Sequence, residues 1–271
     1  MRPLRSIAVL PTMVTLGNLV CGFFAIVIAS RVDKPDALPV VADMVDLYNV
    51  MIAGWLILLG MVFDSMDGQV ARLSNTTSEF GVQLDSLCDL VTFGVAPGFI
   101  LVKMCPRFTY GHGQMVWVIA VLFVICVALR LARFNVETSE DDDHMAFSGL
   151  PSPAGAAAIA SFAIIFHKLN SLDNHGPWID SLYMAMQMIL PFCAVAIAIL
   201  MVSRIPYPHW ANQLLKGQRS LLRVVMLVFF VGFLVVARSF SIPLMFCIFV
   251  LYGPTTYGWK LLSKWRNACT A

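Results

Sequence analysis

The chain has 271 residues, of which 59% are hydrophobic and only 13% are charged, and its formal net charge is +2. Average soluble domains are about 45–50% apolar and about 25% charged. This composition excludes an ordinary soluble domain and predicts a protein surrounded by membrane lipids. The small net charge argues against a nucleic-acid partner.

The apolar segments predict an all-α, polytopic membrane protein. A helix that crosses a bilayer needs about 20 mainly apolar residues, and by this criterion about eight segments qualify, although the closeness of the last two leaves seven possible. The segments lie near residues 11–30, 48–73, 81–103, 114–134, 153–168, 181–203, 220–237 and 240–262. We therefore expect residues 1–271 to form a single membrane domain.

The distribution of Lys and Arg predicts the orientation of the chain, because cytoplasmic loops are enriched in these residues. With eight spans both termini share a side, and that side collects most of the basic residues. We expect a multi-pass protein of the inner or cytoplasmic cell membrane, with both termini on the cytoplasmic side. The first apolar run lacks a small-residue cleavage site, so it is expected to be a retained helix.

Four aspartates lie within the second and third segments. They are Asp64, Asp67, Asp85 and Asp89. The first two are three residues apart and the last two are four apart, so each pair shares one helix face. Between the pairs, Thr76 and Glu79 form a capping box, which starts a new helix. The sequence thus predicts a tight turn near residue 75, with the two pairs of carboxylates facing each other at matched depth.

Carboxylates inside spanning segments are costly and usually functional. Four that converge would repel one another unless cations lay among them, and oxygen ligands favour Mg²⁺ or Mn²⁺. We therefore predict two ions, the arrangement that clamps phosphoryl transfer. Beside the acids, Gly68, Ala71 and Gly81 would let a nucleotide approach the backbone, and Arg72 could reach a phosphate. For the small residues, helix packing is an equally good explanation.

At these residues the sequence resembles the CDP-alcohol phosphatidyltransferase family. The family signature is Asp-x-x-Asp-Gly-x-x-Ala-Arg, eight residues, then Gly-x-x-x-Asp-x-x-x-Asp. The chain matches it at Asp64, Asp67, Gly68, Ala71, Arg72, Gly81, Asp85 and Asp89. The resemblance implies a six-helix core, a site facing the cytoplasm and a homodimer. It also implies that Asp89 is the general base, whereas the residues alone do not separate base from ligand among four similar acids.

Further stretches resemble the branch of this family that uses serine as the acceptor. Residues 10–18 are similar to its Pro-Asn-x-x-Thr-x-x-Asn motif, with Thr12 in place of the usual Asn, and add Thr15 and Asn18 to the residues implied to bind CDP-diacylglycerol. Residues 85–97, 130–135, 147–154 and 205–208 continue the resemblance. It implies that the phosphatidyl group of CDP-diacylglycerol is transferred to L-serine and that CMP is released.

The carboxylate of serine needs a cation, and Arg130 and Arg133 lie one helical turn apart. We expect these two arginines, with Asn135 and Arg204, to bind serine or phosphate, although anchoring at the membrane surface also explains them. Glycerol phosphate, inositol phosphate and choline are alternative acceptors, and the first two would call for a denser basic cluster. A cation transporter or channel is the alternative from another class, and it leaves the Gly, Ala and Arg between the acids unexplained.

Overall fold

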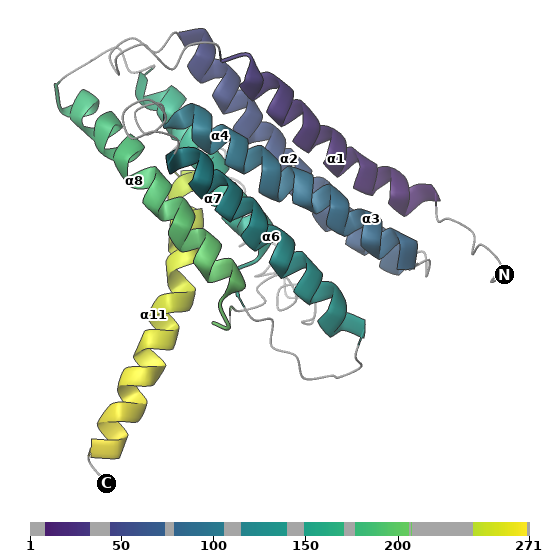
Figure 1. The fold of residues 1–271 in the computed structure, drawn as a ribbon, viewed down its shortest axis with the longest axis vertical. Coiled ribbons are helices and arrows are strands. Elements are labelled where there is room, and N and C mark those ends of the chain that lie inside the picture. The colour runs from purple at the N-terminus through teal and green to yellow at the C-terminus, as the bar shows by residue number, and fades with distance from the viewer. Residues whose placement is uncertain are drawn as a thin grey trace, which may run out of the picture.

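The computed structural model describes residues 9–32, 44–73, 79–105, 115–139, 149–170, 177–205, 207 and 241–269, and the regular elements among them are all helices (Figure 1). These are α1 (Val9–Ser30), α2 (Met44–Leu73), α3 (Glu79–Asp89), the π-helical segment η1 (Leu90–Val95), α4 (Ala96–Met104), α6 (Met115–Ser139), α7 (Ser152–Asn170), α8 (Pro177–Val202) and α11 (Ser241–Cys269). The prediction of an all-α protein is confirmed.

Within the described part of the chain, six helical stretches are long and apolar enough to cross a membrane, and they coincide with the first six predicted segments. The segment predicted near 220–237 lies outside the described residues. The last predicted segment is covered by α11, whose apolar part, Pro243–Thr256, is shorter than the others. The protein is therefore a multi-pass membrane protein.

The third span is one continuous helix built from α3, η1 and α4, with a π-helical turn in its middle. The turn begins directly after Asp89, and at its end the backbone N–H of Ala96 donates to the carbonyl of Val91, five residues earlier. A π turn inserts one extra residue into a helix and is often found at functional sites. It changes the direction of the side chains that follow Asp89.

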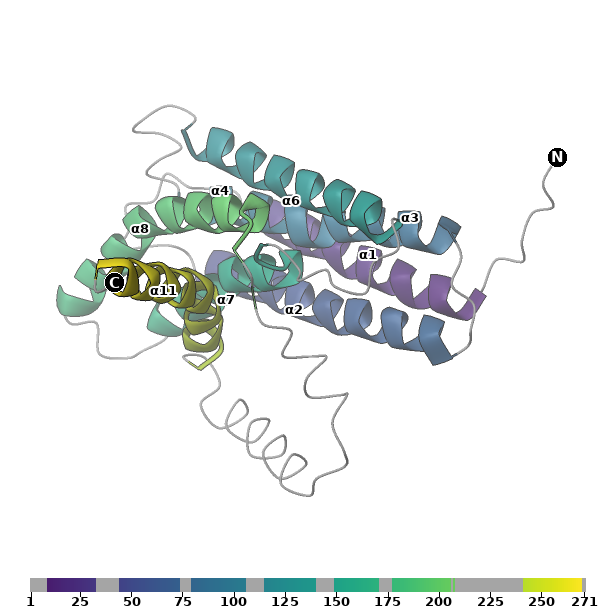
Figure 2. The same ribbon diagram turned by 90° about the horizontal axis from the view of Figure 1, so that it is seen from below.

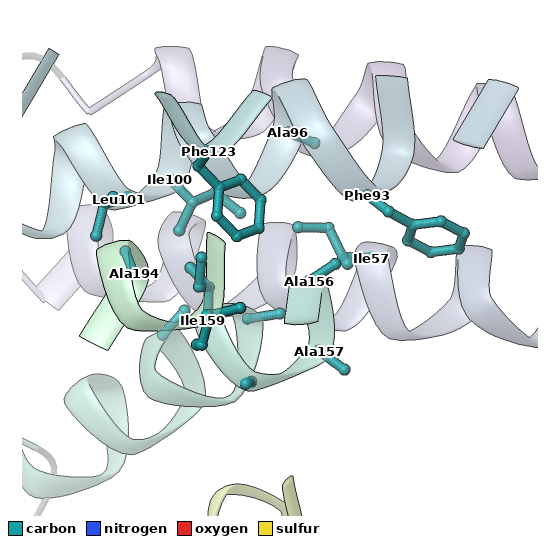
Figure 3. Close-up of a cluster of buried hydrophobic side chains, with 14 of the residues drawn as sticks. Ile57, Phe93, Ala96, Ile100, Leu101, Phe123, Ala156, Ala157, Ile159 and Ala194 are labelled. Atoms are coloured by element: carbon teal, nitrogen blue, oxygen red, sulfur yellow. The ribbon is translucent and has the colours of Figure 1, made fainter. Parts of the chain in front are cut away.

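The buried core is centred on α7, the segment that looks short in the sequence (Figure 3). Its alanines are almost completely buried, including Ala156, Ala157 and Ala160. Small side chains let neighbouring helices approach closely, and a Cβ atom at Gly54 of α2 would lie only 2.8 Å from the carbonyl oxygen of Ala160. Aromatic side chains such as Phe93 and Phe123 are also completely buried in this core.

Two glycines allow α1, α2 and η1 to meet at Thr92. A Cβ atom at Gly22 of α1 would lie 2.7 Å from the Cα atom of Thr92, and one at Gly60 of α2 would lie 2.6 Å from its Cγ2 atom. Contacts this short do not occur between real Cβ atoms and their neighbours. The three elements are thus held at a separation that only glycine permits.

The segment before α7 docks on the end of α8 through its backbone. Gly149 has a φ of +94°, and its N–H donates to the carbonyl of Ile205 at 2.9 Å. The next N–H, of Leu150, donates to Leu200 at 3.0 Å and satisfies a carbonyl in the last turn of α8. Because L side chains rarely adopt this φ, the turn requires glycine.

The terminal helix α11 diverges from the direction of the bundle (Figures 1 and 2). Pro254 within α11 has no N–H, so it cannot donate to the carbonyl of Val250 four residues earlier. The hydroxyl of Tyr207 donates to that carbonyl at 2.9 Å. The ring of Tyr207 packs directly over Gly253, where a Cβ atom would collide with it.

Candidate active site and metal centre

The carboxylates of the predicted hairpin come together where α2 ends and α3 begins. One oxygen from each of Asp64, Asp67 and Asp85 lies within 4.8 Å of the other two. The turn between the helices, residues 74–78, lies outside the described residues, and so does Thr76 of the predicted capping box. The prediction that α2 and α3 bring their acids together is confirmed.

The fourth acid, Asp89, lies one turn further along α3 than Asp85. It interacts electrostatically with Asp64, Asp85 and Asp67. Which acid of α2 each acid of α3 faces stays a prediction. Four carboxylates at this separation repel one another unless positive charge is placed among them.

The donor set fits a hard divalent cation. All of the clustered ligand atoms are carboxylate oxygens, which suit Mg²⁺ or Mn²⁺. Asp67 is only 6% exposed. The Oδ1 atom of Asp85 is buried, and within the described part of the chain it has no hydrogen-bond partner. A buried carboxylate oxygen without a donor is costly, and coordination of a cation would satisfy it.

Asp89 is held from α1 by a hydrogen bond. The side-chain Nδ2 of Asn18 donates to Oδ1 of Asp89 at 2.8 Å, and both residues are buried. Thr92 continues the network, because its Oγ1 donates to the backbone carbonyl of Asn18 at 3.0 Å. The amino-terminal motif and the acidic signature, 71 residues apart in the chain, therefore meet in one site.

The other residues expected to bind CDP-diacylglycerol lie on the elements around the acids. Thr15 is buried on α1 about one turn before Asn18, and Gly81 is half-buried at the start of α3. Gly68, Ala71 and Arg72 belong to the last turns of α2, and their side-chain surroundings lie outside the described residues.

The structure brings Arg130 to the site from α6. Its Nη1 donates to Oγ of Ser152 at 3.0 Å, and its guanidinium interacts electrostatically with Asp89. Its buried Nε has no hydrogen-bond partner within the described residues. Arg133 is half-buried one turn further along α6, and Arg204 is exposed just after α8.

Asn135 has a different set of contacts from those expected of a ligand-binding residue. Its Nδ2 donates to Oγ of Ser86 at 2.9 Å, and the same hydroxyl lies 3.2 Å from Oδ1 of Asn135. Ser86 directly follows Asp85 on α3. Asn135 therefore links α6 to the helix that carries two of the acids.

Three residues at the site could not be identified from the sequence. Thr92, Ser86 and Ser152 all lie inside stretches that resemble the serine-using branch of the family, yet small hydroxyl residues are common in membrane helices and gave no separate signal. Thr92 was the most accessible to inference, because it is a polar residue in an apolar run one turn after Asp89. The partners of Ser86 and Ser152 depend on the packing of α6, which the sequence does not specify.

The fold and the site together define a multi-pass membrane protein with an acidic centre between two antiparallel helices. The chain belongs to the CDP-alcohol phosphatidyltransferase family, whose profile matches residues 8–200. It is 29% identical to a CDP-diacylglycerol–serine O-phosphatidyltransferase of Helicobacter pylori strain ATCC 700392 / 26695, over 93% of this chain and 92% of that protein.

Two further relatives carry the same name. The protein of Methanocaldococcus jannaschii is 35% identical over 59% of this chain and 65% of its own length. That of Bacillus subtilis is 28% identical over 78% of this chain and 96% of its own length. The similarity thus extends over a bacterial and an archaeal relative with one shared name.

Proposed function

We propose that this protein transfers the phosphatidyl group of CDP-diacylglycerol to the hydroxyl of L-serine, forming phosphatidylserine and releasing CMP. The observation that carries this proposal is that Asp64, Asp67 and Asp85 bring their carboxylate oxygens together, with Asp89 interacting electrostatically with all three. Family membership supports the CDP-linked donor, and the names of the relatives support serine as the acceptor. The cation transporter or channel has no support in these findings.

We propose that Asp64, Asp67 and Asp85 hold divalent metal, and that Asp89 adds a ligand for a second ion. The cofactor would be a pair of Mg²⁺ or Mn²⁺ ions. When bound, such ions supply positive charge that neutralises the pyrophosphate and the departing CMP. Thr15, Gly81 and the last turns of α2, with Gly68, Ala71 and Arg72, would surround CDP-diacylglycerol.

The chemical step needs a base, because a serine hydroxyl is a poor nucleophile at neutral pH. In this proposal Asp89 accepts the hydroxyl proton as the serine oxygen attacks the phosphatidyl phosphorus in line. The bond from that phosphorus to the bridging oxygen breaks, and CMP leaves with the electron pair. The acid cluster at the end of α2 and the start of α3 gives these groups a common position.

The serine carboxylate would be bound by Arg130 and Arg133. Arg130 is the better supported of the two, because it donates a hydrogen bond to Ser152 and interacts electrostatically with Asp89. Ser152 begins α7, and the N-terminal end of a helix carries partial positive charge that favours an anion. Arg204 remains a proposed phosphate ligand at the exposed rim, and Asn135 a proposed contributor through its contact with α3.

The active site, both termini and the basic loops are proposed to face the cytoplasm, with the protein in the inner or cytoplasmic membrane. The orientation of the chain rests on the distribution of Lys and Arg. The acids lie at the same end of the bundle as the start of α1, so the active site would face the same side as the amino terminus. A homodimer is the proposed assembly. Mass measurement of the detergent-solubilised protein by light scattering tests it, and a monomer under active conditions contradicts it.

The deciding experiment supplies purified protein and Mg²⁺ or Mn²⁺ with CDP-diacylglycerol and a panel of alcohols. The panel contains L-serine, ethanolamine, choline, glycerol 3-phosphate and inositol phosphate, and both CMP and the lipid product are measured. We expect CMP release to depend on serine, with phosphatidylserine as the product. Preference for another alcohol would refute serine as the acceptor, and absence of CMP with every alcohol would refute the transferase. D64N/D67N is the inactive control.

A further inference from the structure

Asn18 is completely buried, although it belongs to the residues expected to contact CDP-diacylglycerol. Among the described residues, its side chain donates one hydrogen bond, to Oδ1 of Asp89. Its own Oδ1 is packed against α2, where a Cβ atom at Gly60 would lie 3.0 Å away. The amide is therefore enclosed by protein, which leaves no open side for a substrate to contact.

We infer that Asn18 is a positioning residue that fixes the Asp89 carboxylate for the transfer reaction, rather than a residue that binds CDP-diacylglycerol. The inference rests on the proposed function, because it needs Asp89 to act on the acceptor. A side-chain amide has one donor end and one acceptor end, and a carboxylate only accepts. Only the orientation with Nδ2 toward Asp89 avoids placing two acceptors against each other.

The position of Asn18 is fixed by its surroundings. Its backbone carbonyl accepts the hydrogen bond from Thr92, which lies one turn after Asp89 in the π-helical segment. The close approaches of Gly22 and Gly60 to Thr92 set the distances from α1 and α2 to that segment. Asp89 and Thr92 thus each contact Asn18, and α1 holds the carboxylate and its helix together.

This arrangement divides the two oxygens of Asp89 between two tasks. Oδ1 is occupied by Asn18, which stops rotation of the carboxylate about its last bond. Oδ2 would then serve the proton of the serine hydroxyl or a metal ion. A misplacement of about 1 Å in a catalytic group can reduce a rate about a hundredfold, so fixing this rotation affects turnover more than binding.

The test uses N18L, which keeps the approximate volume of the side chain and removes the donor. Binding of CMP in the presence of Mg²⁺ or Mn²⁺ is titrated first, so that turnover is expressed per binding-competent site. We expect kcat per site to fall about tenfold to a hundredfold, with the KM values for serine and CDP-diacylglycerol within about threefold of wild type.

Two variants at Thr92 test the same network by a second route. T92V removes the hydrogen bond to the Asn18 carbonyl and should lower kcat in the same direction but by less. T92S keeps the hydroxyl, so its kcat should be close to that of the wild-type protein. The matched control is S161A, which removes another buried side-chain hydrogen bond, from Ser161 to the carbonyl of Ala158. It should leave kcat per site unchanged.

Wild-type turnover per site in N18L would overturn the inference. Loss of CMP binding in N18L, or a rise in the KM for CDP-diacylglycerol with kcat retained, would overturn it too, because the amide would then serve the nucleotide site. If wild-type protein releases CMP with an acceptor other than serine, the proposed acceptor is wrong, and the same comparison is made with that acceptor. The two failures are therefore distinguishable.

Discussion

Gly60→Ala tests the three-way contact of α1, α2 and η1. The added methyl group would lie 2.6 Å from Cγ2 of Thr92 and 3.0 Å from Oδ1 of Asn18. Both distances are below ordinary van der Waals contact. Because η1 is packed on both sides, the strain cannot be relieved by one side chain rotating away, and α2 must move outward or Thr92 must shift.

Overpacking of a buried site usually costs about 1–3 kcal/mol. At about 2–4 °C per kcal/mol for a domain near this size, the midpoint of thermal unfolding should fall by roughly 2–12 °C. Since Thr92 and Asn18 both adjoin Asp89, turnover should fall with it. The variant G22A should be at least as damaging, because its methyl group would lie 2.7 Å from a backbone atom of Thr92.

A second substitution distinguishes the effects of the two glycine variants. T92S removes the Cγ2 atom that Gly60→Ala strikes, so G60A/T92S should recover most of the lost stability. It leaves the backbone of η1 and the hydroxyl in place, so G22A/T92S should recover little. Thermal unfolding in detergent, at one fixed scan rate, measures all four variants. Wild-type stability in G60A, or equal rescue of both glycine variants by T92S, would refute the packing argument.

Four further predictions follow from the site and from α11. Chelation of divalent cations should abolish CMP release, and Mg²⁺ or Mn²⁺ should restore it; full turnover in excess chelator contradicts the metal centre. Asp89→Asn should lower turnover by about 10²–10⁴-fold and change CDP-diacylglycerol binding less, whereas near-normal turnover excludes it as the base. Arg130→Ala should raise the serine KM about ten- to a hundredfold, because it removes a charge-assisted hydrogen bond of about 1.5–3 kcal/mol. Ser152→Ala should raise the serine KM less. A change in the KM for CDP-diacylglycerol alone would assign Arg130 to the lipid phosphate. Tyr207→Phe should cost about 1–3 kcal/mol by leaving a buried carbonyl unsatisfied, and an unchanged thermal midpoint would contradict this.

The spans and the acid cluster could be predicted because each depends on local spacing. A run of apolar residues fixes where a helix crosses the membrane, and intervals of three and four residues fix which acids share a face. The capping signal near Glu79 then specifies that the chain reverses, so α2 and α3 bring Asp64, Asp67 and Asp85 together without any knowledge of the other helices.

Contacts between distant segments could not be predicted in the same way. The motif around Asn18 predicts contact with CDP-diacylglycerol. Its hydrogen bond to Asp89 depends on how α1 packs against α3, which the motif does not specify. The π-helical turn is invisible to a periodicity argument, because one extra residue in an apolar run changes no composition. Asn135 likewise stood out as a polar residue after two arginines, yet its contact with Ser86 is set by the approach of α6.

Pro254 leaves one backbone carbonyl of α11 without its helical donor, and the hydroxyl of Tyr207 supplies that hydrogen bond from outside the helix. In the hydrocarbon region each unsatisfied backbone carbonyl costs several kcal/mol, so a proline in a membrane helix creates a need for an external donor. Here that donor comes from the segment that follows α8, and Gly253 provides the recess for its ring. The hydroxyl of Tyr207 thus takes the place of the N–H that Pro254 lacks, and this hydrogen bond joins α11 to the rest of the bundle. A shortened protein that ends before α11 would leave the hydroxyl and ring of Tyr207 without their partners Val250 and Gly253, so truncation should affect the end of α8 as well as remove a helix.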